Sequence, residues 1–155
     1  MSRRRTGFTL LELLMVMIVI GLLAGMGILK YIELRHRARA AAVADELQAV
    51  RLAGYSAFYE TGSWPGDASS GVVPAGLKPY LATNFSFAKP EYTLDWESFV
   101  PPGGGPSGGM QVGIVVTTTD PKLQQALVQT LGNKLPFTNV GGTLTFVIVG
   151  PDGKS

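Results

Sequence analysis

The residues able to do chemistry in this 155-residue chain are mostly isolated carboxylates. Asp95 and Glu97 are the exception, because they stand two positions apart and would share one face of a strand. Such a pair could serve a glycosidase or form part of a calcium site. Alternation with Leu94 and Trp96 is better explained by the solvent side of an amphipathic strand, and the tail 150–155 lacks the acidic cluster that calcium needs. We therefore expect neither a catalytic pair nor a metal site.

The other residue types that carry chemistry are scarce. The chain contains one histidine, His36, and no cysteine. A histidine-based triad, a multi-histidine metal site, thiol chemistry and disulfides are therefore not expected, and the redox compartment stays undetermined. We expect no cofactor, and we expect that the protein is not an enzyme.

Glu12 needs a different explanation, because it lies near the start of an apolar run from Phe8 to Leu29. As a helix these 22 residues would be about 33 Å long, which is enough to cross the hydrocarbon core of a bilayer. A carboxylate in hydrocarbon is costly, so it marks a functional candidate whose partner must be named. The stretch Thr9 to Glu12 also has the Thr-x-x-Glu form of a capping box, which satisfies backbone donors at a helix start.

The residues around Glu12 form a short, ordered motif: a basic leader "RRRTG" ending in Gly7, then Phe8, then "TLLELL". This motif resembles the amino-terminal signature of type IV prepilins and of the pseudopilins of type II secretion, over about residues 3 to 35. The resemblance implies that prepilin peptidase cuts between Gly7 and Phe8 and that Phe8 is then N-methylated. It also implies that the segment with Thr9 and Glu12 acts in assembly, where Glu12 pairs with the amine of Phe8 on a neighbouring subunit.

Two other interpretations of the amino-terminal segment compete with the resemblance. A secretory signal peptide has a shorter apolar stretch and a cleaner cleavage site than "GLLAGMG" offers, whereas a plain signal anchor fits the length. Gly21 and Gly25 have the small-x-x-x-small spacing that lets apolar helices approach closely. The family often has a proline partway along this segment, but none occurs between Phe8 and Leu29.

Charge is distributed unevenly along the chain. Residues 1–51 contain eight Lys and Arg against four Asp and Glu, a balance of +4, and residues 52–155 contain five against seven, a balance of −2. This indicates a basic stem near a membrane and a faintly acidic head, and it does not favour nucleic-acid binding. The arginines of 35–39 are expected to form a solvated face that also meets lipid phosphates. Basic residues flank the apolar run on both sides, so the orientation, with the head on the periplasmic side, is implied by the resemblance alone.

Beyond the apolar run the sequence predicts that the helix continues to about Glu60. Apolar or small residues recur at steps of three and four, which predicts a stripe that lies along a sheet. They are Val43, Leu47, Val50, Gly54 and Phe58. Gly62, Pro65 and Gly66 then end the helix.

The remaining sequence predicts a small sheet and one short helix. Strands are expected at 91–100 and 110–119, with the Gly- and Pro-rich loop 101–109 between them, and a hairpin about a Gly-Gly turn at 137–150. A helix over 121–132 should begin at the N-cap Asp120 and end at Gly132. The fold class is therefore α+β, a long amino-terminal helix packed on a small antiparallel sheet.

These observations predict a leader at 1–7, a transmembrane and assembly helix at 8–29, a helical stem at 30–60 and a globular head at 61–155. The resemblance implies a structural subunit of a pilus-like filament, held by a single pass in the inner membrane. Its expected partners are prepilin peptidase, other pilin or pseudopilin subunits, an inner-membrane assembly platform and the lipid bilayer, without nucleic acid. Because pilus subunits of this family often close a carboxyl-terminal loop with a disulfide, the lack of cysteine favours a pseudopilin or a minor pilin over a major pilus subunit. Of these two, we expect a type II secretion pseudopilin. The alternatives are a minor pilin for adhesion or DNA uptake and a signal-anchored periplasmic protein.

Overall fold

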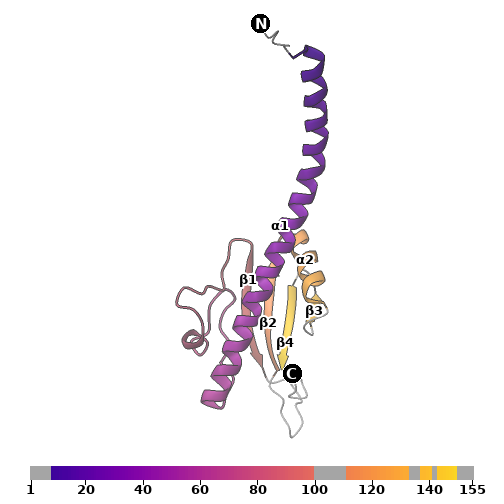
Figure 1. The fold of residues 1–155 in the computed structure, drawn as a ribbon. Coiled ribbons are helices and arrows are strands. Elements are labelled where there is room, and N and C mark those ends of the chain that lie inside the picture. Colours follow the sequence, from indigo (N-terminus) through magenta and orange to yellow (C-terminus); the bar gives the residue numbers. More distant parts are fainter. Residues whose placement is uncertain (1–7, 100–110, 133–136, 141–142, 150–155) are drawn as a thin grey trace. The chain divides into compact units, whose positions relative to one another are not determined.

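The computed structural model describes residues 8–99, 111–132, 137–140 and 143–149. The expectations for the leader 1–7, the loop 101–109, the Gly-Gly turn and the tail 150–155 lie outside these residues. In chain order the elements are α1 (Leu10–Thr61), the 3-10 helix η1 (Lys78–Tyr80), β1 (Tyr92–Phe99), β2 (Gln111–Thr118), α2 (Pro121–Leu131), β3 (Phe137–Val140) and β4 (Thr143–Val149), as Figure 1 shows. Two compact units share α1, namely Met1–His36 and Arg37–Ser155.

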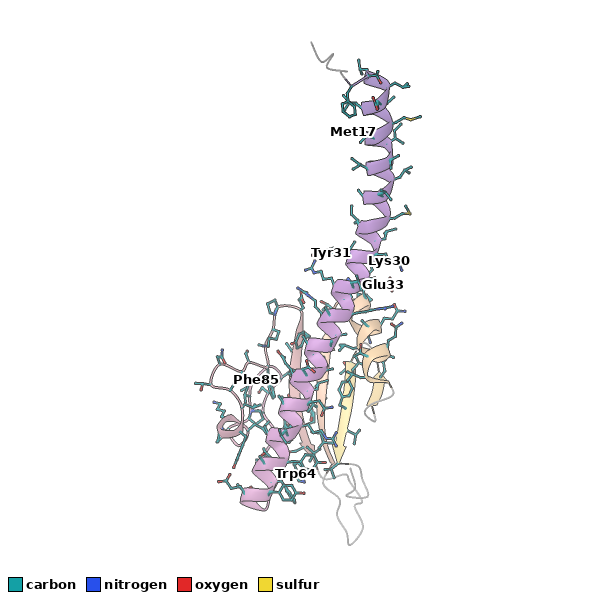
Figure 2. All side chains as sticks on the ribbon, viewed as in Figure 1. Met17, Lys30, Tyr31, Glu33, Trp64 and Phe85 are labelled. Carbon is teal, nitrogen blue, oxygen red and sulfur yellow. The ribbon has the colours of Figure 1, made fainter. Side chains whose placement is uncertain are left out.

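The first unit is the amino-terminal part of α1. Every described side chain from Phe8 to Arg35 is exposed within the chain. Figure 2 shows these side chains projecting from all sides of the helix, with Met17 near its start and Tyr31 further along. The apolar run therefore forms a helix, as the sequence predicts, but nothing in its own unit buries it.

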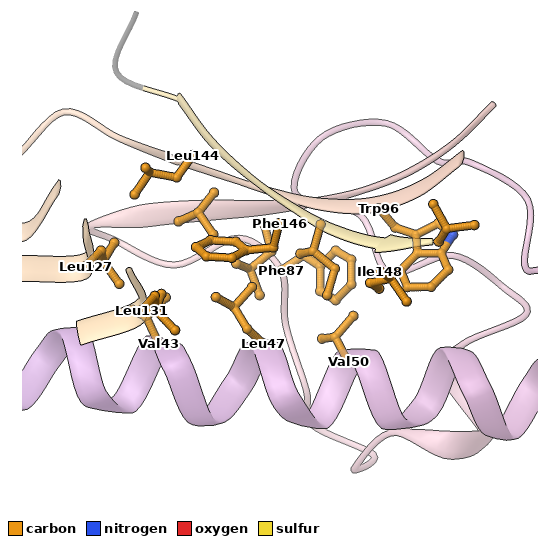
Figure 3. Packing of buried hydrophobic residues seen from close by; sticks show 14 of the residues in the cluster. Val43, Leu47, Val50, Phe87, Trp96, Leu127, Leu131, Leu144, Phe146 and Ile148 are labelled. Carbon is orange, nitrogen blue, oxygen red and sulfur yellow. The ribbon is translucent and has the colours of Figure 1, made fainter. Parts of the chain in front are cut away.

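The second unit has its core between the rest of α1 and a sheet. Val43, Leu47, Val50 and Gly54 are buried, as the stripe predicted, whereas Phe58 is only half-buried. Figure 3 shows Val43, Leu47 and Val50 pointing from α1 toward the sheet. The core residues contributed by the sheet and the segment before it are Leu77, Phe87, Leu94, Trp96, Val112, Ile114, Val116, Leu144, Phe146, Ile148 and Val149.

The sheet is antiparallel throughout, with the strand order β1-β2-β4-β3. From Thr143 to Ile148, residues of β4 alternate between half-buried and buried, because successive side chains point to opposite faces of a strand. The predicted hairpin is confirmed by the pairing of β3 with β4, from Phe137 opposite Phe146 to Val140 opposite Thr143.

Helix α2 connects β2 to β3 and covers the same face of the sheet as α1. Its predicted N-cap is confirmed, since the Asp120 carboxylate accepts a hydrogen bond from the backbone N–H of Lys122 at 2.9 Å. The helix buries Leu123, Leu127 and Leu131, and Figure 3 shows Leu127 and Leu131 beside Val43 of α1.

The segment 62–91, between α1 and β1, lies along the free edge of β1. The N–H of Gly71 donates to the carbonyl of Leu94 at 2.9 Å, and the N–H of Leu94 donates to the carbonyl of Phe87 at 2.9 Å. The predicted end of α1 is confirmed at Gly62, whose φ of 73° lies in the left-handed region that glycine adopts without strain. Its N–H closes the last turn by donating to the carbonyl of Phe58 at 2.8 Å.

Candidate assembly segment and head surface

The start of α1 is capped by Thr9. Its hydroxyl oxygen accepts a hydrogen bond from the backbone N–H of Glu12 at 3.3 Å, and its carbonyl accepts from the N–H of Leu13 at 3.2 Å. Thr9 is therefore the N-cap residue, and Glu12 occupies the third helical position, where an acidic side chain also suits the helix dipole.

The Glu12 carboxylate does not complete the capping box. Among the described residues, the structure records no hydrogen bond or ion pair for it, and Glu12 is exposed. The cap uses the backbone N–H of Glu12, a group that any residue except proline would supply. Helix capping thus explains Thr9 but does not account for the carboxylate of Glu12.

Phe8 precedes this cap and is 75% exposed. Gly7, the other residue of the expected cleavage site, lies outside the described residues. The aromatic ring of Phe8 therefore contributes little to the stability of its own chain.

Gly21 and Gly25 of the apolar run are not required by close contacts with the described residues. A Cβ atom built on Gly21 or Gly25 would meet nothing within 4 Å. Glycine in a helix destabilises it by about 1 kcal/mol relative to alanine. No contact with the described residues compensates for this loss of stability at either site. The open space leaves room for the close approach of another helix along this face.

By length and composition α1 can cross a membrane, and it is the one such helix among the described residues. An apolar helix that is exposed on every side needs an apolar environment from outside its own chain. A bilayer or a bundle of similar helices would supply it.

In the head, the segment before β1 brings a third carboxylate near the pair Asp95 and Glu97. Burial raises the pKa of Asp95, repulsion from Asp67 raises it further, and a hydrogen bond from Ser70 partly offsets both. Burial, Asp67 and Asp95 raise the pKa of Glu97 in the same way. The described residues contain no group of three or more histidines, cysteines or carboxylates arranged to hold a metal ion. Asp95 and Glu97 are half-buried, so they are less open to water than the amphipathic pattern suggested.

Charged and phenolic groups fasten the start of β1 to α1. Glu46 of α1 accepts a hydrogen bond from the Tyr92 hydroxyl at 2.6 Å and lies 3.2 Å from the Lys89 ammonium. Arg39 of α1 forms an ion pair with Glu91. Partial burial and the bond to Glu46 both raise the pKa of the Tyr92 phenol, which therefore stays protonated and donating.

An aromatic cluster at the end of α1 was not predicted. The rings of Phe58 and Trp64 stack with centroids 4.7 Å apart, and the rings of Tyr55 and Trp64 form a T-shaped pair with centroids 5.3 Å apart. The Arg51 guanidinium lies 5.7 Å from the centre of the Tyr55 ring, and Tyr59 is 82% exposed. Helical spacing of aromatic residues could have revealed the part of this cluster in α1, but Trp64 follows the helix and has no periodic partner.

Residues of the segment 62–91 also line a pocket of about 790 Å³ that is open to solvent. Lys78 is its one charged lining residue, and Phe85 and Phe87 contribute aromatic rings 6.0 Å apart. Among the described residues that line it, none is a carboxylate or a histidine.

Comparisons with known proteins bear on the amino-terminal segment and on the fold. Residues 2–28 match the family model of the prokaryotic N-terminal methylation motif. Among solved structures, the major type IV pilin PilA1 from Clostridium difficile is similar with a TM-score of 0.50 and 15% sequence identity, covering 76% of this chain and 99% of that chain. No curated protein gives a significant match. The long helix packed on an antiparallel sheet is thus the type IV pilin fold.

Proposed function

We propose that this chain, which is prepilin-like by its methylation motif and its type IV pilin fold, is a structural subunit of a pilus-like filament. Prepilin peptidase removes the leader after Gly7 and methylates Phe8. The mature subunit is then held in the inner membrane with its head on the periplasmic side. An assembly platform transfers it from the membrane into the filament.

The observation that carries this proposal is the all-round exposure of the apolar helix. Side chains from Phe8 to Leu29 are exposed within the chain, on every side of α1. Removing such a surface from water is strongly favourable, at about 25 cal/mol for each Å² of apolar area. Lipid covers this apolar surface before assembly, and neighbouring copies of the same helix cover it in the filament core.

Glu12 sets the axial position of each helix relative to its neighbours in the filament core. In a filament core its carboxylate would be buried among apolar helices, where an unpaired charge is costly. The new amino group of Phe8 on a neighbouring subunit would neutralise it. Because the described residues offer Glu12 no partner inside the chain, the pairing requires no internal contact to break.

Among filament types, a type II secretion pseudopilin is favoured over a major pilus subunit. The chain has no cysteine and therefore lacks the disulfide that often closes the carboxyl-terminal loop of pilus subunits. Deletion of the gene should then impair the export of secreted proteins. Loss of surface pili with normal export would contradict the assignment to type II secretion and keep the filament role.

The proposal is tested by mass spectrometry of the amino-terminal peptide from protein made in its own cells. We expect a peptide that begins with N-methylated Phe8. An intact leader would indicate a simple membrane anchor, and cleavage near Ala24 or Gly25 would indicate a secreted head. Either result would contradict the filament function.

A minor pilin that binds a surface or ligand is the second candidate, and the aromatic cluster favours it. Leu52 and Tyr59 stand seven positions apart on α1, so they share one face, and they are 69% and 82% exposed. Exposed aromatic side chains are common in binding surfaces. Replacing Tyr59 by Ala should abolish adhesion while leaving assembly intact if this function holds, and unchanged adhesion would contradict it.

A further inference from the structure

Basic residues come directly after the apolar run of α1 in the sequence. Residues 30–39 contain four Lys and Arg and one acidic residue, Glu33. Lys30, Tyr31 and Arg35, here called the collar, lie on the helix directly beyond Leu29, and Figure 2 labels Lys30 and Tyr31.

The collar lies at the right distance from the apolar run to reach a headgroup layer. At about 1.5 Å per residue, Lys30 stands ~1.5 Å and Arg35 ~9 Å beyond Leu29 along the helix axis. Each headgroup region is about 5–8 Å thick. Helical side chains lean toward the amino terminus, which here is the apolar run, so the long Arg35 side chain points back toward that layer. Tyr31, 68% exposed, suits the same depth, where tyrosine is enriched.

The two charges of the collar do not share one face of the helix. Successive residues turn by about 100°, which separates Lys30 from Arg35 by ~140°. A protein or nucleic acid that docks on a helix contacts one stripe of it. A membrane surface meets the helix on all sides, so this arrangement fits a lipid surface better than a docked macromolecule.

Contacts inside the chain leave the collar charges available. Lys30 lies 3.2 Å from Glu33, but the two side chains are 80% and 45% exposed, and such pairs contribute little. Arg35 is exposed and forms no ion pair with the described residues. Arg39 differs, because its guanidinium pairs with Glu91 of the head.

We infer that the collar binds the phosphates of anionic lipid headgroups in the leaflet where the span ends, and that these lipids hold the subunit in the membrane before assembly. This inference rests on the proposed function, since it requires α1 to span a bilayer. Membranes rich in anionic lipid would retain the subunit more strongly than neutral ones.

The test uses the full-length chain in vesicles of phosphatidylcholine mixed with phosphatidylglycerol. Discs are cut from them with a styrene–maleic acid copolymer, and the two lipids bound around the protein are quantified by mass spectrometry. We expect phosphatidylglycerol to be enriched around the wild type, by up to about fivefold for each collar cation, the equivalent of ~1 kcal/mol. The enrichment should fall as salt rises, because screening weakens exposed charges.

The double variant Lys30→Gln/Arg35→Gln should lose this enrichment, and Lys78→Gln/Lys122→Gln, which removes the same charge from the head, should keep it. Equal enrichment in the collar variant and the wild type would overturn the inference while the proposed function stands. Equal loss in the control would also overturn it, because net charge alone would then explain the effect. A chain that fails to integrate into any vesicle would overturn the span and the proposed function together.

Discussion

The indole ring of Trp96 in β1 lies directly against the backbone of α1 at Gly54. A Cβ atom built on Gly54 would fall 2.5 Å from Cη2 of Trp96 and 3.0 Å from Cζ3. The ring is also held from its polar side, since its Nε1 donates to the carbonyl of Pro65 at 3.0 Å. Trp96 is fully buried, so this one side chain joins the helix, the sheet and the segment between them.

Replacing Gly54 by Ala should therefore destabilise the head, although alanine favours helices. Contacts below 3.0 Å force the ring or the helix to move, and overpacking of a core costs about 1–3 kcal/mol. Thermal unfolding of the full-length chain in detergent measures the change. Gly66→Ala is the control, because a Cβ there meets nothing within 4 Å. A Gly54→Ala protein as stable as the control would contradict the contact.

The sequence predicted the helix side of this contact but not its partner. Steps of three and four placed Gly54 on the apolar stripe of α1, because helical periodicity is a local property. Which strand residue lies opposite depends on strand order and register, and both come from pairing between distant segments. The order β1-β2-β4-β3 could not be deduced for the same reason.

In the candidate site too, features set by neighbouring residues were predicted and features set by distant residues were missed. Four consecutive residues, Thr9 to Glu12, predicted a helix cap, and the cap at Thr9 is confirmed. The assembly role of Glu12 stays a prediction, because it depends on neighbouring subunits. The approach of Asp67 to Asp95 was missed, because 28 positions without periodicity separate them. Trp64 was missed as a stacking partner of Phe58, since it lies just after the helix ends.

The Tyr92–Glu46 hydrogen bond should contribute measurably to the stability of the head. Its acceptor is a half-buried carboxylate at 2.6 Å, and bonds to charged groups are worth about 1.5–3 kcal/mol. Tyr92→Phe should therefore lower the free energy of unfolding by about 1.5 kcal/mol. Tyr59→Phe is the control, because Tyr59 is 82% exposed. In a double-mutant cycle with Glu46→Ala, which removes the acceptor, additive losses would show that the two side chains are not coupled.

Stability should depend on pH through Asp95 and Glu97. Their pKa values are raised in the folded head above the ordinary 3.8 and 4.5, so the folded state holds these protons more tightly than the unfolded state. The resulting stabilisation is complete below these ordinary values and is lost as pH rises through the raised values. At neutral pH, folding therefore confines two carboxylates near Asp67 at a cost.

Asp67→Asn removes the repulsion that Asp67 exerts on both groups. It should raise the melting temperature at pH 7 and leave it unchanged well below pH 3.8, where Asp95 and Glu97 are both protonated in the folded head. The gain should be about 0.5 kcal/mol or less, because water screens partly exposed charges. Calorimetry at both pH values checks it. A gain of equal size at both would mean that a change other than charge is responsible.

Maturation should depend on the size of residue 7. Gly7→Leu would move the scissile bond within the peptidase, and a shift of about 1 Å can slow catalysis ~100-fold. The full-size precursor should then accumulate, as a mass measurement of the membrane fraction would reveal. Gly21→Ala, 14 positions beyond the expected cut, should mature at the normal rate. Normal processing of Gly7→Leu would place the cleavage site elsewhere.

Assembly should depend on the charge of Glu12 and not on its shape. Glu12→Gln keeps the backbone N–H that Thr9 caps, so the helix and the processing of the leader should stay intact. The amine of Phe8 on the neighbouring subunit would then be unpaired among apolar helices, at a cost of about 2.5 kcal/mol or more. Filament yield in sheared fractions should fall by about tenfold or more. Glu33→Gln, which removes the same charge further along α1, should assemble normally, and a normal yield from Glu12→Gln would refute the pairing.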